Sequence, residues 1–130
     1  MKKKHKISDS KLSTLWSHAV KAKYKRCPIT GQVRPLESHH IVAKGRQNRF
    51  ALRWDIRNGV PLHPTAHRAI HDGDLDAQRK LIDYVTHRGD KDYLMELKHK
   101  LKPDFLRDIG LTEEEYRAKI KAELEEAIHE

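Results

Sequence analysis

The sequence contains a single cysteine, Cys27, and no long apolar run. One thiol cannot form an internal disulfide, so the fold does not depend on an oxidising compartment. A membrane-spanning helix needs about 18 or more consecutive apolar residues, and the chain has no such stretch. The basic segment 2–6 leads into polar residues instead of the apolar core of a secretion signal. We therefore expect a cytoplasmic protein that makes no contact with membranes.

Acidic residues are scarce in the first part of the chain. Residues 1–71 carry 16 Lys and Arg but only 3 Asp and Glu, whereas residues 72–130 carry 11 and 16, for a net charge of +8 overall. Such a basic half suits a polyanion such as nucleic acid, because each cation placed on a phosphate releases condensed counterions. A solvated, solubilising surface has the same composition, so charge by itself leaves both interpretations open.

The chain also lacks internal repeats and a glycine-rich phosphate loop. Its 130 residues are 37% apolar, which suffices for one compact core. Apolar residues at helical spacing predict an N-terminal amphipathic helix with Ser8 or Ser10 as its N-cap. The face of this helix consists of Leu12, Leu15, Trp16, Ala19, Val20 and Tyr24.

Helical periodicity disappears between residues 27 and 62. Two short strands are predicted, at 37–42 and 59–62, on either side of a polar loop, 43–58, that is rich in arginine. Pro64 suits the first turn of a helix that runs to about Asp72 and stops at Gly73. The predicted order is strand, loop, strand, helix.

Beyond Gly73 the sequence indicates only helices. One is expected to end near Gly89 and a second to end at Pro103, with apolar faces made of Leu75, Leu81, Ile82 and Val85 and of Tyr93, Leu94, Leu97 and Leu101. Thr112 and Glu115 have the spacing of a capping box and predict a last helix that runs to the C-terminus. The apolar face of that helix either packs against the body of the protein or contacts a partner.

Histidine is abundant, and five of the ten histidines lie between His39 and His71. His67 and His71 are four apart on a predicted helix, so they share a face and can bind one metal ion together. His39 and His40 are neighbours on a predicted strand, so their side chains point to opposite sides unless the strand is distorted. One strand histidine with two helix histidines makes a three-ligand site with an open position, which is typical of catalytic metal sites.

The run Ser38-His39-His40-Ile41, then Asn58 after the basic loop, then Leu62 and His67 with His71, resembles the HNH nucleases, the ββα-metal family, over residues 27–73. The resemblance implies an α+β fold, with a short antiparallel β-hairpin and a helix embedded in a mainly α-helical single domain. We expect one HNH nuclease domain, 1–130, divided into a basic arm and N-terminal helix (1–26), the ββα-metal core (27–73) and a helical C-terminal extension (74–130). The short motifs are also similar to those of phage proteins that act in recombination and DNA processing, which would place the chain in the host cytoplasm.

The resemblance implies a metal-dependent endonuclease that hydrolyses DNA phosphodiester bonds and leaves 5′-phosphate and 3′-hydroxyl ends. His40 would be the general base, and His39 and His67 would bind one divalent ion, with His71 as the third ligand or as a residue behind the ligands. Mg, Mn, Ni and Zn all remain open as the ion. Asn58 would hold the loop that presents His40, although an Asn-Gly pair is also an ordinary turn signal.

The basic loop supplies the candidate DNA contacts, which are Lys44, Arg46, Arg49, Arg53 and Arg57. These arginines would contact phosphates that flank the cut, or they would instead pair with the acidic C-terminal half. Phe50 and Trp54 would pack against either the core or a sugar. Nothing in the sequence resembles a helix that reads base edges, so strong sequence specificity is not expected.

The sequence departs from many HNH relatives at their structural zinc site. Two Cys-x-x-Cys pairs are replaced by Cys27 with Thr30 and by His63 with Ala66. Two ligands cannot close a tetrahedral site, so no structural zinc is expected unless a distant histidine such as His18 or His87 completes it. Cys27 is then a small buried residue, and His63 is a helix N-cap or a packing residue.

Other functions remain possible from the sequence. A DNA-binding module could keep the fold with little turnover, although such a module needs no general base like His40. A zinc-stabilised interaction domain is disfavoured by Thr30 and Ala66, whereas RNA as the substrate is not excluded. One active site per chain predicts nicking of a duplex unless the protein forms a homodimer.

Overall fold

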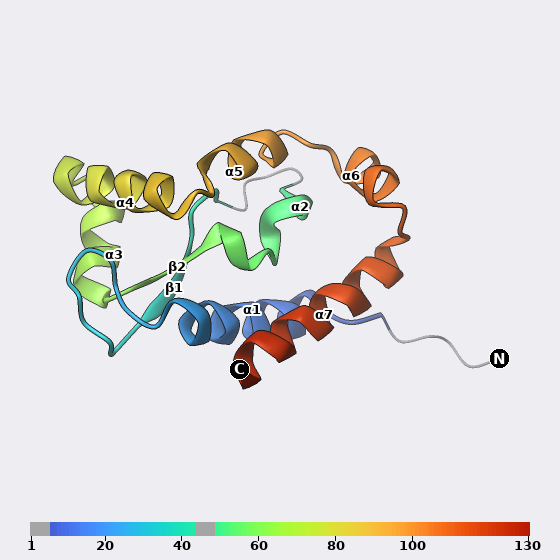
Figure 1. Ribbon diagram of the computed structural model, residues 1–130, viewed down its shortest axis with the longest axis horizontal. Helices are drawn as coiled ribbons and strands as arrows, with labels where there is room; N and C mark the ends of the chain where they lie inside the picture. The colour runs from blue at the N-terminus through green and yellow to red at the C-terminus, as the bar shows by residue number, and fades with distance from the viewer. Residues whose placement is uncertain (1–5, 44–48) are drawn as a thin grey trace.

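The computed structural model describes residues 6–43 and 49–130, which form a mainly helical α+β fold around a two-stranded antiparallel sheet (Figure 1). The strands are β1 (Glu37–His40) and β2 (Gly59–Leu62), with α2 (Phe50–Arg53) and a 3₁₀ turn, η1 (Ile56–Asn58), in the connection between them. The remaining helices are α1 (Asp9–Tyr24), α3 (Pro64–His71), α4 (Leu75–Arg88), α5 (Lys91–Leu97), α6 (Lys102–Ile109) and α7 (Glu113–His129). The predicted fold class is confirmed.

The hairpin places the two adjacent histidines of β1 opposite the start of β2. His39 pairs with Val60 and His40 pairs with Gly59. β1 ends two residues earlier than the sequence predicted, while β2 has the expected bounds. Within residues 49–58, α2 and η1 replace the polar loop that we expected, and Phe50 and Trp54 are buried in the core, which is one of the two roles predicted for them.

Helix α1 packs directly against the hairpin. Ser8 caps the helix by accepting a hydrogen bond from Lys11 N, which confirms one of the two predicted caps. The approach is so close that a Cβ on Gly59 would clash with the side chain of Val20. Gly59 has an extended backbone, so Asn58 and Gly59 do not form the tight turn that the dipeptide allows. Glycine is needed here because α1 lies against β2.

The C-terminal helices show where sequence periodicity was wrong. Helix α4 has the expected end at Gly89, but its buried residues are Ala77, Leu81 and Val85, whereas Leu75 and Ile82 are 79% and 58% exposed. Helix α6 was not predicted, because Pro103 lies in its first turn and does not merely end the segment before it.

The last helix packs against the body of the protein. Thr112 and Glu115 form the predicted capping box at the start of α7. Tyr116, Ile120 and Leu124 are buried in the same cluster as the apolar face of α1, and the two helices cross each other in Figure 1. The structural role of this apolar face is therefore confirmed. Within the described residues, no helix has both the length and the apolar character needed to span a membrane.

Candidate active site

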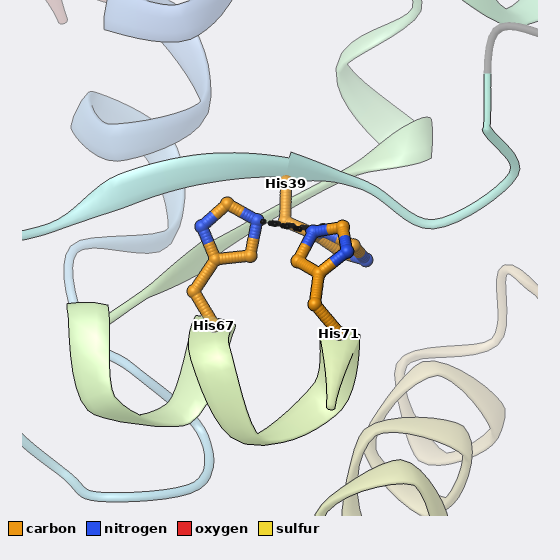
Figure 2. Close-up of side chains that lie close together, drawn as sticks. All are labelled: His39, His67 and His71. Atoms are coloured by element: carbon orange, nitrogen blue, oxygen red, sulfur yellow. Dashed lines mark hydrogen bonds between the residues drawn. The ribbon is translucent and has the colours of Figure 1, made fainter. Parts of the chain in front are cut away.

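Strand β1 and helix α3 bring three imidazole rings together. His39 points from β1 toward His67 and His71, which stand one turn apart on the facing side of α3 (Figure 2). His67 Nε2 lies 3.2 Å from His39 Nδ1 and 3.0 Å from His71 Nε2. One ligand atom from each of the three residues lies within 4.8 Å of the others, so the predicted set is close enough to bind a single ion.

The spacing of these nitrogens fits a divalent metal ion. A tetrahedral ion with metal–nitrogen bonds of about 2.0–2.1 Å holds its ligand nitrogens about 3.3 Å apart, close to both of the shorter contacts. Because a carboxylate can only accept, the Nδ1–H of His67 must donate to Glu37 Oε1, 3.1 Å away. In the neutral ring this leaves the lone pair on Nε2, which faces the other two histidines. A carboxylate behind a ligand histidine orients metal sites in this way.

The protonation of His39 also favours metal binding. Burial of the ring, together with repulsion from His67, His71 and His40 when those rings are protonated, lowers the pKa of His39 to about 4. His39 is therefore neutral near pH 7. A neutral imidazole has a lone pair for a metal ion and loses no proton on binding.

His40 lies on the other side of β1, as the alternation of a strand requires. Its ring stacks on Trp16 of α1, with centroids 3.8 Å apart and planes 8° from parallel. Its Nε2 is 2.9 Å from the backbone oxygen of Arg53. A carbonyl oxygen can only accept, so Nε2 carries the proton and the lone pair of the neutral ring is on Nδ1.

Asn58 fixes the backbone on both sides of the bond between His40 and Arg53. Its side chain is fully buried; Oδ1 accepts from Val42 N at 2.7 Å, and Nδ2 donates to Val42 O at 3.0 Å and to Leu52 O at 3.2 Å. Val42 is two residues beyond His40, and Leu52 is next to Arg53. Asn58 therefore sets the distance between the ring of His40 and the carbonyl that holds it.

The three candidate DNA contacts that the structure describes, Arg49, Arg53 and Arg57, each have a different partner. Arg49 donates to Ala43 O, and Arg53 pairs with Asp9 of α1 at 3.1 Å. Arg57 pairs with the buried Asp90 at 2.6 Å, which is the pairing with the acidic C-terminal half that the sequence left open. Lys44 and Arg46 lie outside the described residues. Phosphate binding by these five residues stays a prediction.

The two remnants of the structural zinc site take part in local hydrogen bonds. Cys27 is buried, as expected, and burial opposes its thiolate, but hydrogen bonds from Thr30 and from the backbone of His63 hold its pKa below the usual value. His63 is the N-cap of α3, where its Nδ1 accepts from Thr65 N. In residues 6–43 and 49–130, the single group of three or more metal-ligand side chains is His39, His67 and His71, so His18 and His87 do not complete a second group.

Two side chains of this site were missed by the sequence reasoning. Glu37 precedes His39 by two residues on β1, so the strand period places both on one face and could have identified it. Trp16 carried no such signal, because it reaches His40 only through the packing of α1 on the sheet. The role predicted for His71 also stays open between ligand and supporting residue, although its Nε2 points into the cluster.

Residues 27–75 match the family model described as HNH endonuclease. The match includes both strands, α3 and the four histidines His39, His40, His67 and His71, and it leaves out α1 and α4 to α7 apart from the first residue of α4. Neither the curated proteins nor the solved structures contain a significant match to the chain. Residues 27–75, a segment that contains the hairpin and α3, are therefore similar to the HNH endonuclease family.

Proposed function

We propose that the protein is a metal-dependent endonuclease that hydrolyses phosphodiester bonds of DNA. The observation that carries this proposal is the convergence of His39, His67 and His71 on one side of β1, with His40 next to them on the same strand. All four lie in the segment that matches the HNH endonuclease family. A structural site would need a fourth protein ligand, whereas three ligands leave a position open for substrate or water.

His40 is the general base of this proposal. The carbonyl of Arg53 keeps the proton on Nε2, so Nδ1 accepts the proton of the attacking water. The lone pair of a neutral imidazole is a suitable acceptor for that proton. Asn58 serves the reaction indirectly, because it holds the backbone at Val42 and Leu52 and so preserves the orientation of His40.

His39, His67 and His71 are the proposed metal ligands, and Glu37 orients His67. When bound, a divalent ion would act as a Lewis acid and stabilise the charge that develops on the phosphate oxygens. Imidazole ligands accept Zn, Ni or Mn, and Mg would complete its shell with water and phosphate, so the ion is identified by experiment.

DNA is the proposed substrate because the basic first half of the chain suits a polyanion and the family acts as endonucleases. Lys44, Arg46 and Arg49 are proposed to contact phosphates. Arg53 is paired with Asp9, and Arg57 is paired with Asp90. Each of these arginines can contact a phosphate only if it leaves its aspartate or binds the aspartate and the phosphate at the same time. With one site per chain, the expected product is a nicked duplex.

Plasmid relaxation tests the proposal. The wild-type protein is treated with a chelator, and Mg, Mn, Ni or Zn is then added back separately. We expect nicking to need a metal, and His40→Ala to lower the rate by about 10²–10⁴-fold, the usual contribution of general acid–base catalysis. His87→Ala changes an exposed histidine of α4 and is the matched control, with wild-type activity expected.

Three outcomes of this experiment are informative. Loss of nicking in His40→Ala, with DNA binding retained, supports both the nuclease and the assignment of the base. Equal rates for His40→Ala and wild type would refute the base assignment. If the wild type binds DNA but never cuts it under any metal, the protein is a binding module and the proposed activity is wrong.

A further inference from the structure

Helix α1 lies outside the segment that matches the HNH family, yet it contacts the candidate base directly. Trp16 is 3% exposed, and its indole ring covers one face of the His40 ring. The indole Nε1–H donates to the backbone oxygen of Asp55 at 2.8 Å, which fixes the position of the indole relative to the connection between the strands. Ser38 Oγ donates to Ser17 O at 2.6 Å and ties β1 to the same helix.

These contacts bear on the orientation of His40. The bond from Nε2 to the carbonyl of Arg53 holds one edge of the ring, and a single hydrogen bond does not by itself prevent rotation about its own axis. A flat indole 3.8 Å away and nearly parallel blocks this rotation. The indole of Trp16 and the carbonyl of Arg53, from two different parts of the chain, therefore both contribute to the orientation of the His40 ring.

We propose that Trp16 is a positioning residue for His40 and that α1 is therefore part of the active site. This inference rests on the proposed function, in which His40 is the general base. Trp16 touches neither the metal ligands nor, in this proposal, the substrate. Its loss should lower kcat and leave KM and metal binding nearly unchanged.

The test compares Trp16→Leu and Trp16→Phe with Phe105→Leu. Phe105 is a buried aromatic residue of the same core cluster, and its ring contacts are Phe50 and Tyr116. All variants are assayed for nicking at a temperature at which thermal denaturation shows them to be folded. We expect Trp16→Leu to lower kcat by on the order of 10²-fold, the effect of a small misplacement of a catalytic group.

Trp16→Phe keeps a flat ring against His40 and should retain most of the activity, although it loses the bond to Asp55. Phe105→Leu should keep the wild-type kcat per folded molecule. Isothermal titration with Ni or Zn should give the wild-type affinity for Trp16→Leu. Equal kcat for Trp16→Leu and Phe105→Leu would overturn the proposal, because Trp16 would then have no specific effect on His40. A matching loss of metal affinity in Trp16→Leu would also overturn it, because it indicates general damage to the site.

A second measurement does not depend on nuclease activity. The indole ring current should shift the ring-proton NMR signals of His40 upfield, with the signals assigned by their loss in His40→Ala. The shift should vanish in Trp16→Leu and persist in Phe105→Leu. A wild-type protein that shows the shift but never cuts DNA refutes the proposed function, whereas cleavage without the shift refutes the stacking and with it the role of Trp16.

Discussion

Replacement of Asn58 by alanine should destabilise the protein by about 3 kcal/mol. The side chain is fully buried and makes three hydrogen bonds, to Val42 N, Val42 O and Leu52 O. Each contributes about 1 kcal/mol net, and a buried group left without its partner costs about 1–3 kcal/mol. The total is a large part of the roughly 5–15 kcal/mol that holds a typical domain folded.

The loss should also reach the chemistry, because Asn58 holds the backbone on both sides of the bond from His40 to Arg53 O. Urea denaturation measures the free energy of unfolding, and plasmid nicking at a temperature where the variant is folded measures the remaining rate. We expect the nicking rate to fall even when every molecule is folded. A destabilisation below about 1 kcal/mol, within the range of a single exposed contact, would refute the reasoning.

Asn58→Asp separates the accepting from the donating role of this side chain. One carboxyl oxygen can still accept from Val42 N, but the other faces the carbonyl oxygens of Val42 and Leu52, which accept only. The pKa of this carboxyl should therefore be raised in the folded variant above its unfolded value of about 3.9. Relative to wild type, the variant should be least destabilised at acidic pH and should lose stability as pH rises through the raised pKa. A pH-independent difference in urea midpoints would contradict this.

Three further predictions concern the packing and the metal site. Gly59→Ala places a methyl group against Val20 and should cost about 1–3 kcal/mol by overpacking, seen as a lower Tm; an unchanged Tm would show that α1 can move away. Glu37→Gln weakens the support of His67, a proposed metal ligand, and should lower the affinity for Zn or Ni by roughly 10–100-fold in calorimetry, and wild-type affinity would exclude Glu37 from the site. Leu124→Ala opens a cavity between α7 and α1 and should cost about 2–5 kcal/mol, whereas Leu75→Ala, at an exposed position, should change the unfolding free energy little; similar losses at both would contradict the packing of α7.

The sequence predicted the parts of the site that depend on local geometry. The four-residue spacing of His67 and His71 requires only a helix, and the alternation of His39 and His40 requires only a strand. The capping residues Ser8 and Thr112 also act within one turn of their own helix. Patterns of this kind are encoded in a few neighbouring residues, and the structure agrees with them.

Amphipathic faces were predicted less well. Apolar spacing put Leu75 and Ile82 on the buried side of α4, yet both are exposed. The buried side is chosen by what lies against the helix, and no local pattern contains that information. Helix α6 was missed because Pro103 was interpreted as the end of the preceding helix, whereas it lies in the first turn of a new one whose Phe105 packs on Phe50 and Tyr116.

Taken alone, the sequence determined the two strands and the helix that carry the histidines, the helix caps at Ser8 and Thr112, and the set of histidines that converge on one point, since these follow from backbone periods and local hydrogen bonds. Tertiary structure decided that Trp16 stacks on His40 and that Arg57 pairs with Asp90. It also decided that Gly59 must be glycine, because α1 packs against β2 there. Each of these contacts joins residues more than 20 positions apart, so it arises only when the helices pack around the hairpin.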